Sequence, residues 1–177
     1  MTPLPNPEVQ SSADFRDLLL LLVGHFQRPG TPTPQIDDVL LRWEGTLPER
    51  APQPGWSGLA AQLLTALAAP PAGPAEPAPL SREQEPSGPL ELQAFLRALA
   101  ADYARSRAWT EDRVARGLWA GDGGGWASGS LPQYLESWHA WLDTWLDERR
   151  DPRDVPPIEP VSWESVALQL EAASAYE

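Results

Sequence analysis

The chain has 177 residues, nine tryptophans and no cysteine, so it can bury a substantial core, whereas disulfides and thiolate metal sites are excluded. Its formal net charge is -12, and all thirteen basic residues are arginine, as expected of a GC-rich bacterial coding bias. Nucleic-acid binding needs cationic side chains against phosphates and an anionic membrane repels acidic chains, so neither partner is expected.

The first predicted helix follows a proline-rich tail, residues 1–12, and ends near Phe26. Ser11 and Asp14 have the spacing of a capping box, in which each side chain bonds to the backbone N–H of the other residue. Residues 18–23 are apolar on every face of this helix. We therefore expect that run to lie in a buried seam, because it is far too short for a membrane span of about 20 residues.

Two more helices are predicted before residue 70. Thr33 as cap and Pro34 at the first helical position begin one of them, which ends near residue 47. An amphipathic pattern from Trp56 to Ala68 predicts the other. Residues 70–89 are rich in proline, alanine and glycine, which is typical of an extended, solvated linker.

The second half, residues 90–177, begins with a helix predicted to run to about Ser106. Residues 107–129 then form an insertion that has no counterpart in the first half, residues 13–69. Ser130 begins a tryptophan-rich helix, with Gln133 three residues later as a second capping box. Ser162 caps a last helix that runs from residue 163 to the terminus.

The two halves match segment by segment, which indicates an internal repeat. The first match pairs Phe15, Leu18, Leu19, Leu22 and Phe26 with Leu92, Phe95, Leu96, Leu99 and Tyr103. The second, counted from Pro34 and Pro132, pairs Ile36, Leu40 and Trp43 with Tyr134, Trp138 and Trp141, and the third pairs Trp56, Leu59, Gln62 and Leu63 with Trp163, Val166, Gln169 and Leu170. The predicted fold is all-α: two tandem three-helix repeats packed as a pseudo-two-fold helical bundle, joined by the proline-rich linker.

Most tryptophans lie on the apolar stripes of the predicted helices, where large aromatic side chains build a core. Three of them, Trp138, Trp141 and Trp145, share one helix and could overfill a small core. An open aromatic pocket near Trp138 and Tyr134 is therefore the alternative, and it would make the chain a small enzyme or a ligand-binding protein.

Trp119 and Trp126 differ from these, because they flank the glycine-rich stretch around Asp122 inside the insertion. Large exposed aromatics on a loop are typical of interface anchors. The alternative is that the insertion folds back and the two tryptophans pack against the rest of the protein. The glycine run lacks the lysine and Ser/Thr of a phosphate-binding loop.

No pattern for catalysis, a metal or a cofactor is present, and we predict that the chain is not an enzyme. The two histidines, His25 and His139, lack a second histidine four residues later, and no nucleophile stands in a recognisable turn. The acids Asp143, Asp147 and Glu148 lie in the acidic second half, and we expect them to contact a partner. The N-terminus lacks the basic and apolar regions of a signal peptide, so a cytoplasmic location is expected.

The second half resembles a small acidic bacterial domain family of unknown function. The residues that carry the resemblance are Leu92, Phe95, Leu96, Leu99, Asp102 and Tyr103, then Trp109, then Leu131, Tyr134, Leu135, Trp141 and Leu142, then Ser162, Trp163, Ala167, Leu170, Ala172, Tyr176 and Glu177. The first half has no equivalent of Trp109 and no Tyr-Glu after its third helix, so it looks like a degenerate copy. The resemblance implies no activity.

The sequence therefore predicts a noncatalytic, acidic protein-binding module that engages a basic partner, in the manner of an inhibitor or immunity-type protein. Its predicted contact residues are Trp119, Trp126, Asp122, Asp143, Asp147 and Glu148. Charge complementarity of this kind speeds association and selects partners. A nucleic-acid mimic is a further alternative, which requires acidic side chains in a row at phosphate-like spacing.

Overall fold

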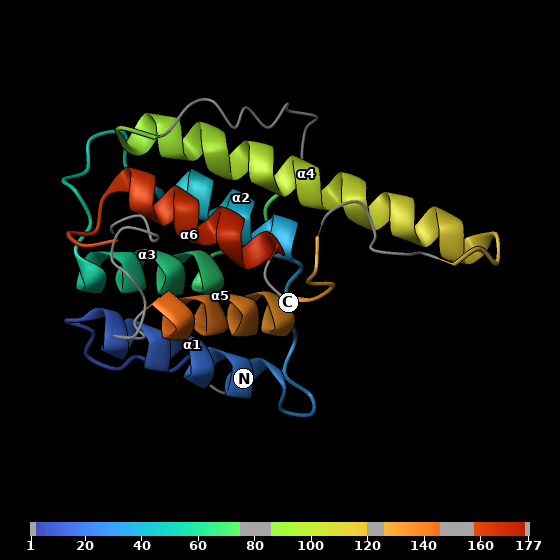
Figure 1. The fold of residues 1–177 in the computed structure, drawn as a ribbon, viewed down its shortest axis with the longest axis horizontal. Helices are drawn as coiled ribbons and strands as arrows, with labels where there is room; N and C mark the ends of the chain where they lie inside the picture. Colours follow the sequence, from blue (N-terminus) through green and yellow to red (C-terminus); the bar gives the residue numbers. More distant parts are fainter. Residues whose placement is uncertain (1–2, 75–85, 120–125, 146–157, 176–177) are drawn as a thin grey trace.

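The computed structural model describes residues 3–74, 86–119, 126–145 and 158–175. This part of the chain contains six α-helices and no strand, which confirms the all-α prediction (Figure 1). The helices are α1 (Ser12–Phe26), α2 (Ile36–Thr46), α3 (Trp56–Ala68), α4 (Pro89–Ala115), α5 (Leu131–Trp145) and α6 (Trp163–Ala175).

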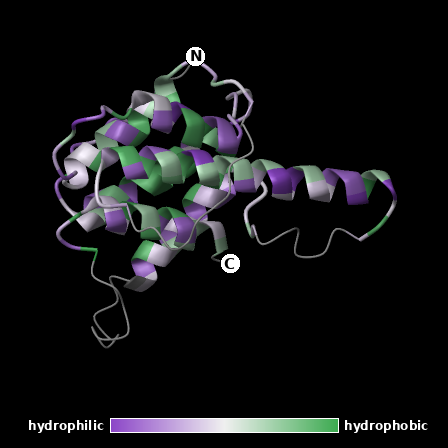
Figure 2. Ribbon diagram, turned by 90° about the horizontal axis from the view of Figure 1, so that it is seen from above, coloured by the Kyte–Doolittle hydropathy of each residue, from purple (hydrophilic) through white to green (hydrophobic). Residues whose placement is uncertain are grey.

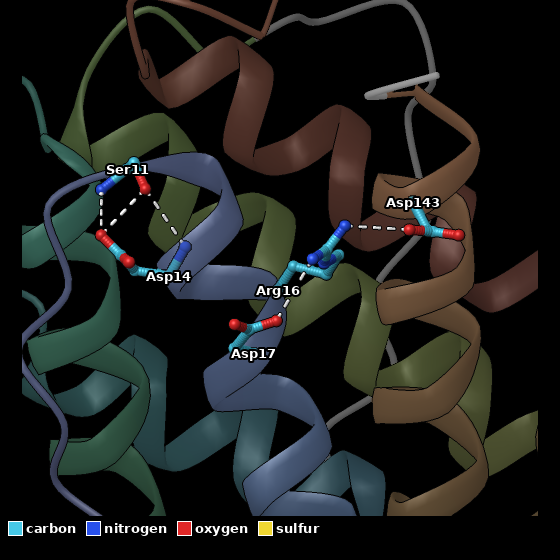
Figure 3. Close-up of polar contacts among 5 residues, drawn as sticks. All are labelled: Ser11, Asp14, Arg16, Asp17 and Asp143. Carbon is cyan, nitrogen blue, oxygen red and sulfur yellow. Dashed lines mark hydrogen bonds and ion pairs between the residues drawn. The ribbon is translucent and has the colours of Figure 1, made fainter. Parts of the chain in front are cut away.

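Two of the predicted helix starts are confirmed in atomic detail. The Asp14 N–H donates to the Ser11 hydroxyl at 3.2 Å, and the Ser11 N–H donates back to the Asp14 carboxylate at 3.0 Å. These contacts complete the capping box of α1, shown in Figure 3. At α6, the Ser165 N–H donates to the Ser162 hydroxyl at 3.1 Å, and the Ser162 N–H donates to the Ser165 hydroxyl at 2.9 Å.

The other two predicted caps differ in detail. α2 begins at Ile36, two residues later than predicted, so Pro34 lies outside the helix. Its N-cap is Gln35, without a side-chain bond, and the Thr33 hydroxyl donates to the Phe26 carbonyl at 3.3 Å. At α5, the Gln133 amide oxygen accepts from the Gly129 N–H at 3.0 Å and from the Ser130 hydroxyl at 3.1 Å. Both predictions located the start of the helix to within about one turn, but they did not identify the hydrogen bonds that are made there.

The apolar run at residues 18–23 is only partly buried, contrary to the prediction that every face would be covered. Leu18, Leu19 and Leu22 are fully buried, whereas Leu20 is 46% exposed and Leu21 is 50% exposed. A helix on the outside of a bundle buries one stripe of its surface and turns the opposite face toward solvent. The run therefore contributes one buried stripe to the core.

The packing of the helices connects the two halves of the chain rather than closing each half on itself. α1 packs against α5 and α2 packs against α4, while α3 packs on α2 and α1, and α6 packs on α5 and α4. The side chains at the centre of this arrangement form one continuous core, of which the largest fully buried members are Trp43, Trp138, Trp163, Phe15, Leu18, Leu19, Leu22, Ile36 and Leu40.

α4 runs antiparallel to α2, as three polar contacts along the pair demonstrate. The Gln93 amide donates to the Leu47 carbonyl at 2.6 Å, at the end of α2. Arg97 then pairs with Glu44, and Arg107 reaches Asp37 at 3.3 Å, at the start of α2. α4 continues to Ala115, beyond this last contact, whereas α2 begins at Ile36 and has no residues alongside the rest of α4.

Candidate functional site

The end of α4 projects from the body of the molecule, which corrects the prediction that this helix stops near Ser106. Figures 1 and 2 show the last turns of α4 extending away from the other five helices. Ser106 is the last buried residue of the helix. We call residues 107–119 the α4 arm; its exposed large apolar side chains are Trp109 (44%), Val114 (62%), Leu118 (48%) and Trp119 (81%).

The arm ends in a well-formed helix cap. Gly117 has a φ of 68°, a left-handed conformation that glycine adopts without strain. The Leu118 N–H donates to the Arg113 carbonyl at 2.9 Å and the Gly117 N–H donates to the Val114 carbonyl at 3.0 Å. This pair of bonds is the Schellman motif, which satisfies carbonyls at a helix end. The tip is therefore ordered by its own backbone, and it holds Leu118 and Trp119 in solvent.

Arginine side chains brace the arm. The Arg113 guanidinium lies 4.8 Å from the centre of the Trp109 ring, a cation–π contact, and its Nε donates to the Trp119 carbonyl at 2.9 Å. Arg116 pairs with Asp112 at 2.9 Å. The arm carries three arginines and two acids, so it is slightly basic in a chain whose net charge is -12.

Trp126 is not an exposed anchor, and the alternative prediction, that the insertion packs against the rest of the protein, holds for this residue. Its side chain is 9% exposed. Its indole N–H donates to Asp102 at 2.9 Å, and its ring lies 5.0 Å from that of Tyr103 and 5.8 Å from that of Tyr134. The structure therefore separates Trp126, which packs on the body, from Trp119, which the arm exposes.

Asp143 is exposed, as predicted, near the end of α5, and its carboxylate already has a partner. Arg16 of α1 donates to it at 2.9 Å, and 62% of the Asp143 side chain is exposed (Figure 3). Asp143 follows the first residue of α5 by twelve residues, which is about 18 Å along the helix. Asp122, Asp147 and Glu148 lie outside the described residues. Of the described members, Trp119 is exposed on the arm and Trp126 is buried on the body, so these two do not share one contact surface.

The core around Trp138 and Tyr134 is filled, so the predicted aromatic pocket has no space there. Trp138 is fully buried and donates its indole N–H to the Gln169 side-chain oxygen at 3.1 Å. Tyr134 donates its hydroxyl to the Leu170 carbonyl at 2.8 Å. The residual cavity that these side chains border measures about 10 Å³, about the volume that one water molecule needs. The side chain of Trp145 lies outside the described residues.

A larger hollow of about 540 Å³ lies between residues 6–10 and the first turns of α3. Its floor includes Trp56, whose indole N–H donates to Glu159 at 3.1 Å. Val9 of the N-terminal segment is 4% exposed, so that segment covers part of α3. Among the described residues that line it, Glu8 is the one carboxylate.

Three described side chains have shifted pKa values, and each shift has a structural cause. Burial raises the pKa of the Tyr134 hydroxyl well above its usual range, and it also raises the pKa of Tyr103. The backbone N–H of Gln10 and the Ser11 side chain hold the pKa of Asp14 below its ordinary value. These shifts follow from core packing and helix capping. Across the described ranges, no three histidine or acidic side chains gather to hold a metal ion.

A membrane-spanning segment is absent from the described part of the chain, since no helix there combines the required length with sufficient apolarity. In comparisons with known proteins, no family model matches the chain, and no curated protein or solved structure matches it. The resemblance of the second half to a bacterial domain family therefore stays a prediction.

Proposed function

We propose that this protein is a noncatalytic protein-binding module and that the α4 arm is its contact element. The observation that carries the proposal is the exposure of Trp109 and Val114 on the projecting end of α4 and of Leu118 and Trp119 just after its cap. Interface hot spots are enriched in tryptophan and arginine, and the arm combines both. Isolated exposed apolar residues are ordinary, but here they share one projecting, capped helix end.

The local sequence supports a role for the arm outside the core. Arginine, alanine and glutamate favour helix formation without a buried face, and Gly117 ends the helix at a defined residue. Since the arm buries few apolar side chains of its own, its contribution to the core is small. A structured helix that presents apolar groups to solvent is suited to insertion into a groove of another protein.

The partner in this proposal is a basic protein, as for an inhibitor or immunity-type protein. The net charge of -12 supports that choice, because complementary charge speeds association. The described arm itself is slightly basic, so the attraction comes from the acidic body while the arm supplies apolar contact. Asp143 is one exposed acid on that body; Asp147 and Glu148 follow it in the sequence.

The experiment compares two exposed positions on different helices. Trp119→Ser removes the most exposed apolar side chain of the arm, and Leu21→Ser removes an exposed leucine from α1 as the matched control. The proposal predicts that candidate partners captured by the wild-type protein are lost with the first variant and kept with the second. Equal capture by both variants, at equal helix content by circular dichroism, would contradict the arm as the contact element.

We also infer that the chain is a tandem duplication arranged about a pseudo-two-fold axis. In a duplication, α1, α2 and α3 correspond to α4, α5 and α6. The interhelical contacts support this inference, because the contact of α1 with α5 corresponds to that of α4 with α2, and the contact of α2 with α3 corresponds to that of α5 with α6. The paired bonds from Trp43 to Gln62, at 3.3 Å, and from Trp138 to Gln169, at 3.1 Å, follow the same exchange.

The register of the middle helices differs from the ungapped sequence match. The first residues of α2 and α5 are Ile36 and Leu131, and counting from them pairs Trp43 with Trp138 instead of Trp141. The two registers differ by three residues, close to one helical turn. Apolar residues therefore face apolar residues in either register, which is why the sequence alone suggested the pairing of Trp43 with Trp141. The two tryptophans so paired stack on each other, with ring centroids 6.3 Å apart.

A further inference from the structure

The two halves meet along a seam of buried apolar side chains. The first helix of each half, α1 or α4, packs on the middle helix of the other half, α5 or α2. At the centre, the Trp43 and Trp138 rings stack at an interplanar angle of 25°, and Phe15 packs edge-on against Trp138 with centroids 5.2 Å apart. A buried aromatic seam of this kind resembles an obligate interface between subunits.

Neither half can leave this seam uncovered. A unit of about 60 residues buries only about 60% of the surface of its unfolded chain, and here the middle helix of each half is covered by the other half. Phe15, Trp43 and Trp138 are each no more than 1% exposed. The seam therefore demands a complementary half, but its contacts do not depend on whether that half belongs to the same chain.

The connection between the halves is long compared with the distance that it crosses. The Ala72 N–H donates to Asp38 at 2.8 Å, next to the contact between Asp37 and Arg107. The chain must then return to Pro89, eighteen residues before Arg107 in α4, which is about 27 Å along the helix. The seventeen residue steps from Ala72 to Pro89 can reach about 56 Å when extended.

We propose that the seam also serves as an interface between two copies of this chain, in which α4–α6 of each copy pack on α1–α3 of the other. In such a domain-swapped dimer, each six-helix unit contains α1–α3 of one copy and α4–α6 of the other, and every contact of the seam is kept. Exchange of identical elements is a low-cost route to a dimer. The second copy is the occupant that fits, since it supplies the same side chains. This inference is independent of the function proposed for the α4 arm.

The first test shortens the connection. Deletion of residues 74–87 leaves three steps between Ala72 and Pro89, which reach only about 10 Å and cannot close the seam within one chain. The proposal predicts a particle of twice the 19.4 kDa chain mass, measured by size-exclusion chromatography with light scattering, with the helix content of the wild type. A control with the same residues replaced by fourteen Gly and Ser residues is expected to keep the mass distribution of the wild-type protein at the same concentration.

The second test uses the full-length protein, in case the deletion prevents folding. Two wild-type preparations with different affinity tags are mixed in urea and refolded together at low and at high concentration. Dimers that carry both tags are expected, and their fraction is expected to rise with concentration; native proteins mixed without unfolding serve as the control. A folded deletion variant of single-chain mass would overturn the proposal. So would the absence of doubly tagged dimers at every concentration.

Discussion

The seam between the halves and the α4 arm use the same residue type in opposite ways. Trp43 and Trp138 are buried, and each donates its indole N–H to a glutamine, whereas Trp109 and Trp119 are exposed on the α4 arm, which leaves the body. Tryptophan serves both purposes because it combines a large apolar surface with one hydrogen-bond donor. The abundance of tryptophan in this sequence therefore indicates neither a core nor an interface until the surroundings of each ring are known.

The largest expected difference between the two regions is in stability. Trp138→Ala removes a fully buried ring and should cost about 3–5 kcal/mol of unfolding free energy, as is usual for large-to-small core substitutions. Trp119→Ala, at 81% exposure, should stay within about 0.5 kcal/mol. Urea denaturation followed by circular dichroism measures both, and similar losses would contradict the division between seam and arm.

A finer comparison lies within the seam, between the two glutamines that accept from its tryptophans. Gln169 is fully buried, so Gln169→Ala leaves the Trp138 N–H without a partner and should cost about 1–3 kcal/mol. Gln62 is half-buried, where water can replace its bond to Trp43, so Gln62→Ala should cost about 0.5–1 kcal/mol. Chemical denaturation of the two variants side by side checks the order, and a reversed order would show that burial does not set the cost.

Alkaline pH should lower the free energy of unfolding because of Tyr134. Burial raises the folded-state pKa of this hydroxyl above its ordinary value of 10.0, so the folded state keeps the proton while the unfolded state loses it. The contribution of the protonated Tyr134 hydroxyl to the free energy of unfolding is full below about pH 10. Above about pH 10 this contribution falls by about 1.4 kcal/mol per pH unit. Tyr134→Phe should flatten this slope, with Tyr103 supplying part of the remainder, because burial raises its pKa too. An unchanged slope in denaturation at several alkaline pH values would refute the assignment.

The parts of the fold that sequence reasoning predicted are those set by local signals. Ser11 with Asp14 and Ser162 with its following turn mark helix starts, and the structure contains the bonds that these spacings imply. The third helix, Trp56–Ala68, was predicted to the residue, because its amphipathic pattern begins and ends sharply.

The site was harder to predict, for two physical reasons. The α4 arm has no buried stripe, so apolar periodicity stops at Ser106 although the helix continues to Ala115; the available signal was Gly117, which marks a helix end. Trp126 and Trp119 are only seven residues apart, and their different burial depends on a tertiary partner of Trp126, Asp102. No local pattern contains that information.

The last comparison uses two glycines that have the same backbone conformation, one in the arm and one in the body. The smallest change in global stability is expected for the glycine in the arm. Gly117 in the arm has a φ of 68° and Gly30 in the loop after α1 has a φ of 79°, and a Cβ added at either position meets no atom within 4 Å. Alanine therefore introduces the same strain at both positions, about 1 kcal/mol. Gly30→Ala should lower the free energy of global unfolding by that amount, because the loop joins two helices of the core.

Gly117→Ala should leave global unfolding almost unchanged, because the strain can be relieved by fraying the last turn of the arm. Hydrogen exchange should then report faster exchange at the N–H groups of residues 117 and 118, whose bonds to α4 form the cap. An equal loss of global stability in both variants would mean that the arm unfolds with the core as one cooperative unit. In that case the arm would belong to the fold itself, and its exposed tryptophans would need another explanation than a separate contact element.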